Sequence, residues 1–232
     1  MGERVLLLGG TREAAALARQ LDARGDDVTT SLAGRTREPN PLVGKVRVGG
    51  FGGADGLARY IRAERIDRVI DATHPFAARI SANAELACTA TDTPLDVRTR
   101  PPWPRHADDR WLDVKDEADA AARLPGEARA LLALGAQRLA PFADRTDVHF
   151  VVRMIDPPTA QLPLAKHTLV LSRPSADWRE EAALLHEHLV THVVSRNAGG
   201  SGAYAKIEAA RRMALPVLMI RRPSQAGVRS PT

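Results

Sequence analysis

The stretch that decides the fold is Arg4-Val-Leu-Leu-Leu-Gly-Gly-Thr-Arg-Glu13, near the start of the 232-residue chain. Its apolar run predicts a buried strand, and Gly9-Gly10-Thr11 predicts a turn that leads into a helix. Glycines let a phosphate approach the backbone, and the unpaired N–H groups of the following helix favour an anion there. A tight turn in which Thr11 caps the helix explains the same residues without any ligand.

Apolar strands and amphipathic helices alternate along the rest of the chain, which predicts parallel sheets covered by helices, an α/β fold. In the first half we expect strands at 5–8, 28–32, 46–48, 68–72 and 95–98, and helices at 13–24, 54–64 and 77–90. In the second half we expect strands at 111–114, 130–134, 149–154, 168–171, 192–195 and 217–220, and helices at 116–124, 178–187 and 203–213.

A domain boundary is expected at Pro101-Pro102-Trp103-Pro104, because proline fixes its own φ and removes a backbone donor. We therefore predict one domain over residues 1–100 and a second over 101–223. The tail 224–232 contains Ser, Gly, Pro and Arg without periodicity, and we expect it to be disordered.

The formal charge of +5 favours an anionic partner. Nucleic acid is the weaker choice because the arginines are scattered and no nucleic-acid-binding motif is evident. No apolar run approaches the roughly 20 residues that span a bilayer, so we expect a cytoplasmic protein without membrane association. Cys88 is the only cysteine, which excludes an internal disulfide. It leaves no cysteine cluster for zinc, and we expect no metal and a thiol on a helix face.

The end of the second strand, Thr30-Ser31-Leu32-Ala33-Gly34-Arg35, carries no acidic residue. A carboxylate at this position usually bonds the ribose 2′-hydroxyl of NAD, whereas Ser31 and Arg35 suit a 2′-phosphate. The sequence therefore predicts NADPH rather than NADH, unless Arg35 is a solvated loop residue.

Two further loops follow the third and fourth strands, Gly49-Gly50-Phe51-Gly52-Gly53 and Asp71-Ala72-Thr73-His74-Pro75-Phe76. The carboxyl edge of an open parallel sheet is where such folds bind ligands, so these loops converge on one predicted cofactor site. His74 is either an acid or base or, as we favour, a residue that orients its loop. The predicted cofactor-binding residues are Gly9, Gly10, Thr11, Arg12, Glu13, Ser31, Gly34, Arg35, Gly50, Phe51, Gly52, Thr73, His74 and Pro75.

A second glycine-rich loop, Ser195-Arg-Asn-Ala-Gly-Gly-Ser-Gly202, leaves a predicted strand and enters a helix that carries Tyr204 and Lys206. These side chains and several arginines suit carboxylate groups. A flexible turn with a solvated Lys206, and arginines that are surface charges, remain the alternatives. The predicted substrate-binding residues are Arg79, Arg100, Arg153, Asn197, Gly199, Gly200, Ser201, Tyr204 and Lys206.

Five segments in the same order resemble the precorrin-6A reductase family over about residues 4 to 223. They are Leu-Leu-Gly-Gly-Thr-Arg-Glu-Ala, Val-Gly-Gly-Phe-Gly-Gly, Asp-Ala-Thr-His-Pro-Phe-Ala, Arg-Pro-Pro-Trp and Asn-Ala-Gly-Gly-Ser-Gly-Ala-Tyr-Ala-Lys-Ile-Glu-Ala-Ala-Arg. One departure is Arg196-Asn197-Ala198, where family members often carry Lys-Asn-Ser, which puts one side-chain contact in doubt.

The resemblance implies two Rossmann-like domains with the active site in the cleft between them. It also implies NADPH-dependent reduction of a ring double bond of precorrin-6A, a polycarboxylate tetrapyrrole, to precorrin-6B in cobalamin biosynthesis. We expect no other partner than, at most, a transient hand-over from neighbouring pathway enzymes.

Hydride transfer needs no protein nucleophile, because the cofactor carries the chemistry and the protein positions the reactants. The accompanying proton can come from His74, Tyr204, Lys206 or solvent, and our hypothesis is that no single acid is essential.

Two other functions compete with this one. A short-chain-type carbonyl reductase needs Tyr-x-x-x-Lys on one helix, and Tyr204-Ala205-Lys206 has the wrong spacing. An NADP-sensing module without catalysis would keep the first turn but leave the second loop without a use.

Overall fold

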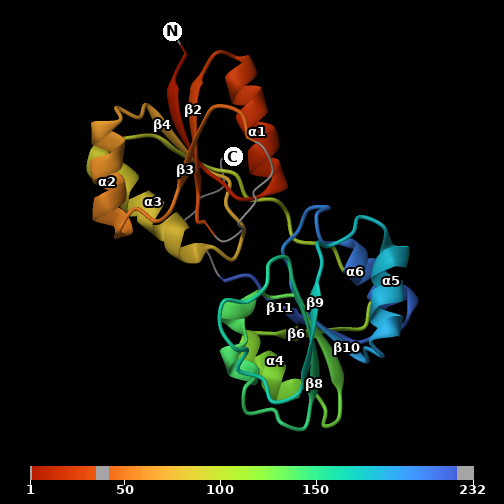
Figure 1. The fold of residues 1–232 in the computed structure, drawn as a ribbon. Helices are drawn as coiled ribbons and strands as arrows, with labels where there is room; N and C mark the ends of the chain where they lie inside the picture. Colours follow the sequence, from red (N-terminus) through yellow and green to blue (C-terminus); the bar gives the residue numbers. More distant parts are fainter. Residues whose placement is uncertain (1, 35–41, 224–232) are drawn as a thin grey trace. The chain divides into compact units, whose positions relative to one another are not determined.

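The computed structural model describes residues 2–34 and 42–223. The chain divides into two compact units (Figure 1), one ending at Arg100 and the other comprising Pro101–Arg222, with Pro223 grouped with the first. Each unit is an α/β domain with its own parallel sheet, which confirms the predicted fold class. The predicted tail 224–232 lies outside the described residues.

The first unit contains a five-stranded parallel sheet in the order β3-β2-β1-β4-β5. Its elements are β1 (Arg4–Leu8), α1 (Arg12–Ala23), β2 (Asp27–Leu32), β3 (Lys45–Val48), α2 (Gly53–Ala63), β4 (Arg68–Asp71), α3 (Ala78–Thr91) and β5 (Leu95–Val97).

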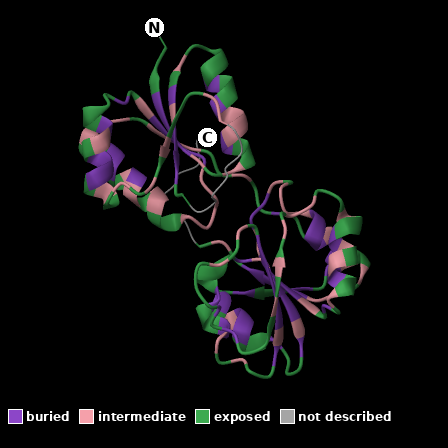
Figure 2. Cartoon of the chain, viewed as in Figure 1, coloured by how far each residue is buried: buried purple, intermediate pink, exposed green. Residues whose placement is uncertain are grey.

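Alternate residues of β1 build the two halves of this unit's core. Val5 and Leu7 pack with α1, whereas Leu6 and Leu8 pack with α2 and α3 on the other face. Figure 2 shows the buried residues along the strands and on the inner sides of the helices. Cys88 is buried on α3, as expected, and its burial raises the pKa of the thiol to about 11.

The second unit contains a six-stranded parallel sheet in the order β6-β11-β10-β7-β8-β9. Its strands are β6 (Trp111–Val114), β7 (Arg129–Leu132), β8 (His149–Met154), β9 (His167–Leu171), β10 (His192–Arg196) and β11 (Val217–Ile220). Its helices are α4 (Glu117–Arg123), α5 (Trp178–Glu187) and α6 (Ala205–Arg212), with two short 3₁₀ turns, η1 (Ala136–Arg138) and η2 (Ala140–Phe142).

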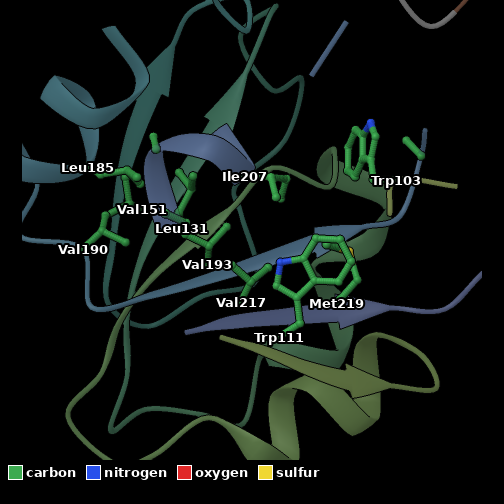
Figure 3. Packing of buried hydrophobic residues seen from close by; sticks show 13 residues of the cluster. Trp103, Trp111, Leu131, Val151, Leu185, Val190, Val193, Ile207, Val217 and Met219 are labelled. Carbon is green, nitrogen blue, oxygen red and sulfur yellow. The ribbon is translucent and has the colours of Figure 1, made fainter. Parts of the chain in front are cut away.

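Helices α5 and α6 pack together over one hydrophobic cluster, which Figure 3 shows from close by. The cluster includes Trp103, Trp111, Leu131, Leu185 and Ile207. The 3₁₀ turns between β7 and β8 were not predicted, since proline at position 141 and the short apolar segment give no helical period. None of the helices in the described part of the chain has the length and apolar character needed to cross a membrane.

Candidate cofactor and substrate sites

The first predicted site lies where the strand order of the first sheet reverses. The chain runs from β1 outward to β2 and β3, and then returns to β4 on the other side of β1. The loops that follow β1 and β4 therefore diverge from neighbouring carboxyl ends, which is where open α/β sheets bind ligands.

Thr11 connects these two loops. Its hydroxyl accepts a hydrogen bond from the Ala14 N–H at 3.0 Å, so it caps α1 as the ligand-free interpretation requires. The same hydroxyl donates to the Ala72 carbonyl at 3.1 Å, beyond the end of β4. The Thr11 carbonyl also accepts from the Ala15 N–H at 3.2 Å. Capping and ligand binding are compatible here, because these contacts of Thr11 leave α1 beginning beside Gly10.

The two glycines of the turn serve different purposes. The Gly9 N–H donates to the Ser31 carbonyl at 3.0 Å, and a Cβ on Gly9 would lie 3.0 Å from the Thr30 methyl group. Gly10 has a φ of +103° and open space where a Cβ would stand. Gly9 thus permits close packing against β2, whereas Gly10 leaves the backbone accessible from outside.

The loop after β4 is held by two of its own side chains. The buried Asp71 carboxylate accepts from the Thr73 N–H at 3.0 Å and from the Thr73 hydroxyl at 2.6 Å. His74 Nδ1 accepts from the Phe76 N–H at 3.2 Å. Because Nδ1 is an acceptor, the neutral ring carries its proton on Nε2. This geometry supports the loop-orienting role that we favoured for His74.

Arg47 on β3 was missed by the sequence analysis. Its guanidinium donates to the Gly49 carbonyl at 2.6 Å and to the Gly50 carbonyl at 2.8 Å, and it lies 3.9 Å from the centre of the Phe51 ring. Arg47 therefore fixes the shape of the glycine-rich loop before α2. An arginine two residues before a glycine run that also contains an aromatic residue was the available signal.

The end of β2 is only partly described. Ser31 is buried, and Gly34 has a φ of +71° with its Cβ position 3.0 Å from a Val48 methyl group. Arg35, the predicted partner of a 2′-phosphate, lies outside the described residues. Arg12 and Arg79 are exposed, and the Arg100 guanidinium donates to the exposed Glu13 carboxylate at 2.5 Å.

The second predicted site follows β10, which lies beside β7 where the order of the second sheet reverses. Asn197 faces the backbone of Trp103, and the Trp103 indole N–H donates to the Gly200 carbonyl at 2.6 Å. Gly199 is buried and Ser201 is exposed. The loop is therefore packed on one side by the segment that begins the second unit.

Tyr204 and Lys206 both contact the Trp103 ring but differ in their polar partners. The Tyr204 hydroxyl accepts from Arg211 at 2.5 Å, and Arg211 also donates to the buried Asp109 carboxylate at 2.8 Å. Lys206 Nζ donates to the Ala203 carbonyl at 2.8 Å and lies 5.2 Å from the centre of the Trp103 ring. Lys206 is buried, so the alternative of a solvated Lys206 is wrong.

Burial shifts the pKa of Lys206. Together with the nearby Arg153 charge, and against the opposing effect of Glu181, it lowers the pKa of the ammonium to about 7. Arg153 is itself buried, and one of its terminal nitrogens donates to both Glu181 oxygens at 2.7 Å. Arg153 and Lys206 thus both lie inside the second unit. The burial of Arg153 is possible because Glu181 on α5 neutralises its charge.

The predicted residues fall into two groups. The described residues of the β1, β2, β3 and β4 loops lie at the carboxyl edge of the first sheet, and those of the β10 loop and the start of α6 lie in the second unit. Arg79 on α3 and Arg100, both predicted to bind the substrate, belong to the first unit. Arg153 belongs to neither group, because it lies on β8 and pairs with Glu181 on α5. Within the described residues, no three histidine, cysteine, aspartate or glutamate side chains are placed to hold a metal.

Two parallel sheets, each with a glycine-rich loop at the reversal of its strand order, define a two-unit α/β protein with Rossmann-like domains. Comparison with known proteins then defines the family. The family model "Precorrin-6x reductase CbiJ/CobK" matches residues 4–232, and the chain belongs to this family.

The chain is 46% identical over 222 residues to the precorrin-6A reductase of Rhodobacter capsulatus, covering 95% of this chain and 88% of that protein. It is 28% identical over 233 residues to the cobalt-precorrin-6A reductase of Priestia megaterium, covering 94% and 90% of the two chains. The solved structure "CobK precorrin-6A reductase" superposes with a TM-score of 0.92 at 45% identity, covering 97% and 89%.

Proposed function

We propose that this chain is an oxidoreductase of cobalamin biosynthesis that reduces a ring double bond of precorrin-6A with NADPH, giving precorrin-6B. Family membership supports the reaction class, and the observation that carries the cofactor assignment is the open glycine cradle of the first unit. We also keep the sequence-based expectation of a cytoplasmic enzyme as part of this proposal.

The cradle fits a cofactor that approaches the backbone closely. A Cβ at Gly10, Gly49, Gly50, Gly52 or Gly53 would meet no atom of the protein within 4 Å. Gly50 is informative because its φ lies outside the left-handed region, so neither conformation nor crowding requires glycine there. A ligand that occupies this space accounts for the missing side chain.

We assign the Gly9–Glu13 turn and the start of α1 to the cofactor pyrophosphate, since helix N–H groups and the dipole favour an anion. Thr73, His74 and Pro75 would border the cofactor beside β4, and Gly50, Phe51 and Gly52 beside β3. Ser31, Gly34 and Arg35 would meet the 2′-phosphate. Turnover with NADPH and NADH, in the wild type and in Arg35→Ala, tests the last assignment; equal use of both coenzymes by the wild type would contradict it.

We assign the Asn197–Gly202 loop to the substrate carboxylates, which need charged or hydrogen-bonding partners when they leave water. Exposed Arg79 and half-buried Arg100 are proposed to add further partners. Arg153 and Lys206 are enclosed, and we assign them to support of the loop.

The substrate is proposed to be free of cobalt, because the sequence identity to the precorrin-6A reductase of Rhodobacter capsulatus, 46%, exceeds the 28% identity to the cobalt-precorrin-6A reductase of Priestia megaterium.

When bound, NADPH supplies a hydride to one carbon of the double bond, a proton adds to the adjacent carbon, and NADP⁺ and the reduced ring result. The residues of the protein bind and orient the cofactor and the substrate. His74 holds its loop through Nδ1, Tyr204 is engaged by Arg211, and Lys206 by the Ala203 carbonyl. These engagements support the hypothesis that no single acid is essential. If His74→Ala, Tyr204→Phe or Lys206→Ala alone lost nearly all turnover while retaining both affinities, the hypothesis would be wrong.

The proposed reaction is tested by incubating the purified protein with NADPH and precorrin-6A and following the absorbance of both. We expect stoichiometric loss of NADPH and formation of precorrin-6B, and slower turnover of cobalt-precorrin-6A. An NADP-sensing module would bind NADPH without turnover. A carbonyl reductase would oxidise NADPH with small carbonyl compounds instead, and either outcome would overturn the proposal.

A further inference from the structure

We propose that Trp103 is a positioning residue, which holds the Asn197–Gly202 loop in the shape that receives the substrate carboxylates. The inference rests on the proposed function, since that assigns the loop to the substrate. Trp103 is 6% exposed and acts through the loop rather than by contact with the substrate.

The first contact is a two-way pairing between Trp103 and Asn197. The Trp103 backbone N–H donates to Asn197 Oδ1 at 2.8 Å, and Asn197 Nδ2 donates back to the Trp103 carbonyl at 3.3 Å. The side-chain amide thereby pairs with both backbone polar groups of Trp103. Asn197 is committed to this pairing, so its role in binding is to place the loop.

The second contact sets the direction of the peptide bond after Gly200. The Trp103 indole N–H donates to the Gly200 carbonyl at 2.6 Å. In a planar trans peptide the carbonyl and the following N–H point in opposite directions. The Ser201 N–H is therefore directed away from the indole, and the Ser201 side chain is exposed. Losing the indole N–H would release this peptide bond.

Two further contacts leave the loop no room to shift inward. A Cβ on Gly199 would lie 2.1 Å from the Pro101 carbonyl oxygen, which only glycine permits. Arg222, after β11, donates to the Asn197 carbonyl at 2.9 Å and to the Ala198 carbonyl at 3.1 Å. The first and last residues of the second unit thus hold positions 197–200, and Ser201 remains on the accessible side.

The test compares Trp103→Phe with Trp111→Phe. Both indoles are buried in the same cluster (Figure 3). The Trp111 indole nitrogen, however, has no hydrogen-bond partner among the described residues. Both variants lose ring volume, and only Trp103→Phe loses a bond to the loop. We expect Trp103→Phe to raise the KM for precorrin-6A on the order of ten-fold, with kcat and the Kd for NADPH unchanged. Trp111→Phe is expected to lower only the Tm.

Equal KM values for precorrin-6A in the two variants would overturn the proposal. Ser201→Asp, measured in parallel, separates this failure from failure of the proposed function, because an exposed carboxylate repels a polycarboxylate without disturbing packing. If Ser201→Asp raises the KM and Trp103→Phe does not, the loop binds the substrate and Trp103 does not position it. If neither raises the KM, the substrate assignment of the loop fails as well.

A variant of the loop itself keeps the test decisive if Trp103→Phe does not fold. Asn197→Leu is close in size and removes both the acceptor for the Trp103 N–H and the donor to the Trp103 carbonyl without adding a charge. We expect it to raise the KM for precorrin-6A while the Kd for NADPH stays the same. An unchanged KM in folded Asn197→Leu would overturn the proposal.

Discussion

The surroundings of each glycine indicate whether the fold or, as we propose, a ligand requires it. Gly199 is crowded by the Pro101 carbonyl, whereas Gly50 has neither a crowded Cβ position nor a left-handed φ. Gly50→Ala should therefore fold with an unchanged Tm but bind NADPH on the order of ten-fold more weakly, because the added methyl group enters the cofactor space.

Titration of NADPH against the folded variant measures the change. Gly126→Ala is the matched control, since Gly126 also lacks a left-handed φ and its Cβ would make only an ordinary contact at 3.5 Å with Asp147. An unchanged Kd for NADPH in Gly50→Ala would remove Gly50 from the cofactor site.

Variants of the Arg153–Glu181 pair can show whether Arg153 supports the fold or binds the substrate. Both side chains are 3% exposed, so Glu181→Gln leaves a buried guanidinium uncompensated and should lower the free energy of unfolding by about 3–5 kcal/mol. The double variant Arg153→Met with Glu181→Leu should recover most of that stability.

Urea unfolding and the KM for precorrin-6A are measured on the same samples. If Arg153 supports the fold, the folded double variant keeps the KM of the wild type. A large rise in KM for a stable double variant would return Arg153 to the substrate site.

At the scale of elements, the capping of α1 also connects β1 with β4. Thr11→Ala removes both the cap and the bond to the Ala72 carbonyl, and we expect it to lower the free energy of unfolding by about 2 kcal/mol. Thr11→Ser keeps the hydroxyl and should cost far less in urea unfolding. Equal destabilisation by the two substitutions would show that the methyl group, and not the hydroxyl, matters.

The positions of strands and helices follow from the sequence because they depend on local periodicity and on glycine and proline. The β1–α1 turn, the acid-free end of β2 and the β10 loop were all found in this way. The pairing of Trp103 with Asn197 joins residues 94 positions apart, and that of Arg153 with Glu181 joins residues 28 apart. No local pattern encodes such contacts, so these four residues gain their roles only from the packing of the sheet. Arg47 is different, since its partners are two and three residues away and the signal was present.

At the scale of the whole molecule, histidines of the second unit couple stability to pH. Burial lowers the pKa of His149, and the charges of Arg129, His167 and Lys166 lower it further; burial also lowers the pKa of His192. His149 Nε2 lies 2.8 Å from the Thr168 hydroxyl, on neighbouring strands.

Because both pKa values are lower in the folded state, the unfolded chain takes up protons first as the pH falls. The contribution of these two histidines is therefore constant above about pH 7 and decreases as the pH falls from about 6.5 toward the folded pKa values. Lys206, whose pKa is about 7 in the folded protein, adds a loss of stability that begins at higher pH. Asp147 acts in a separate window at lower pH, since the bond from Arg145 lowers its pKa to about 2. The part of the loss between pH 6.5 and 5 that belongs to His149 and His192 is therefore measured with variants of these two residues.

Thermal unfolding at pH 7.5 and 5.5 measures this coupling, and we expect the Tm to fall by a few degrees at the lower pH. The double variant His149→Gln with His192→Gln should lose most of that difference, because glutamine does not titrate. Replacement of the exposed His106 by glutamine is the control and should leave the difference as it is in the wild type. If the double variant kept the full pH dependence, the proton uptake would belong to other groups, and the neutral state of these two half-buried rings would have no part in the stability of the second sheet.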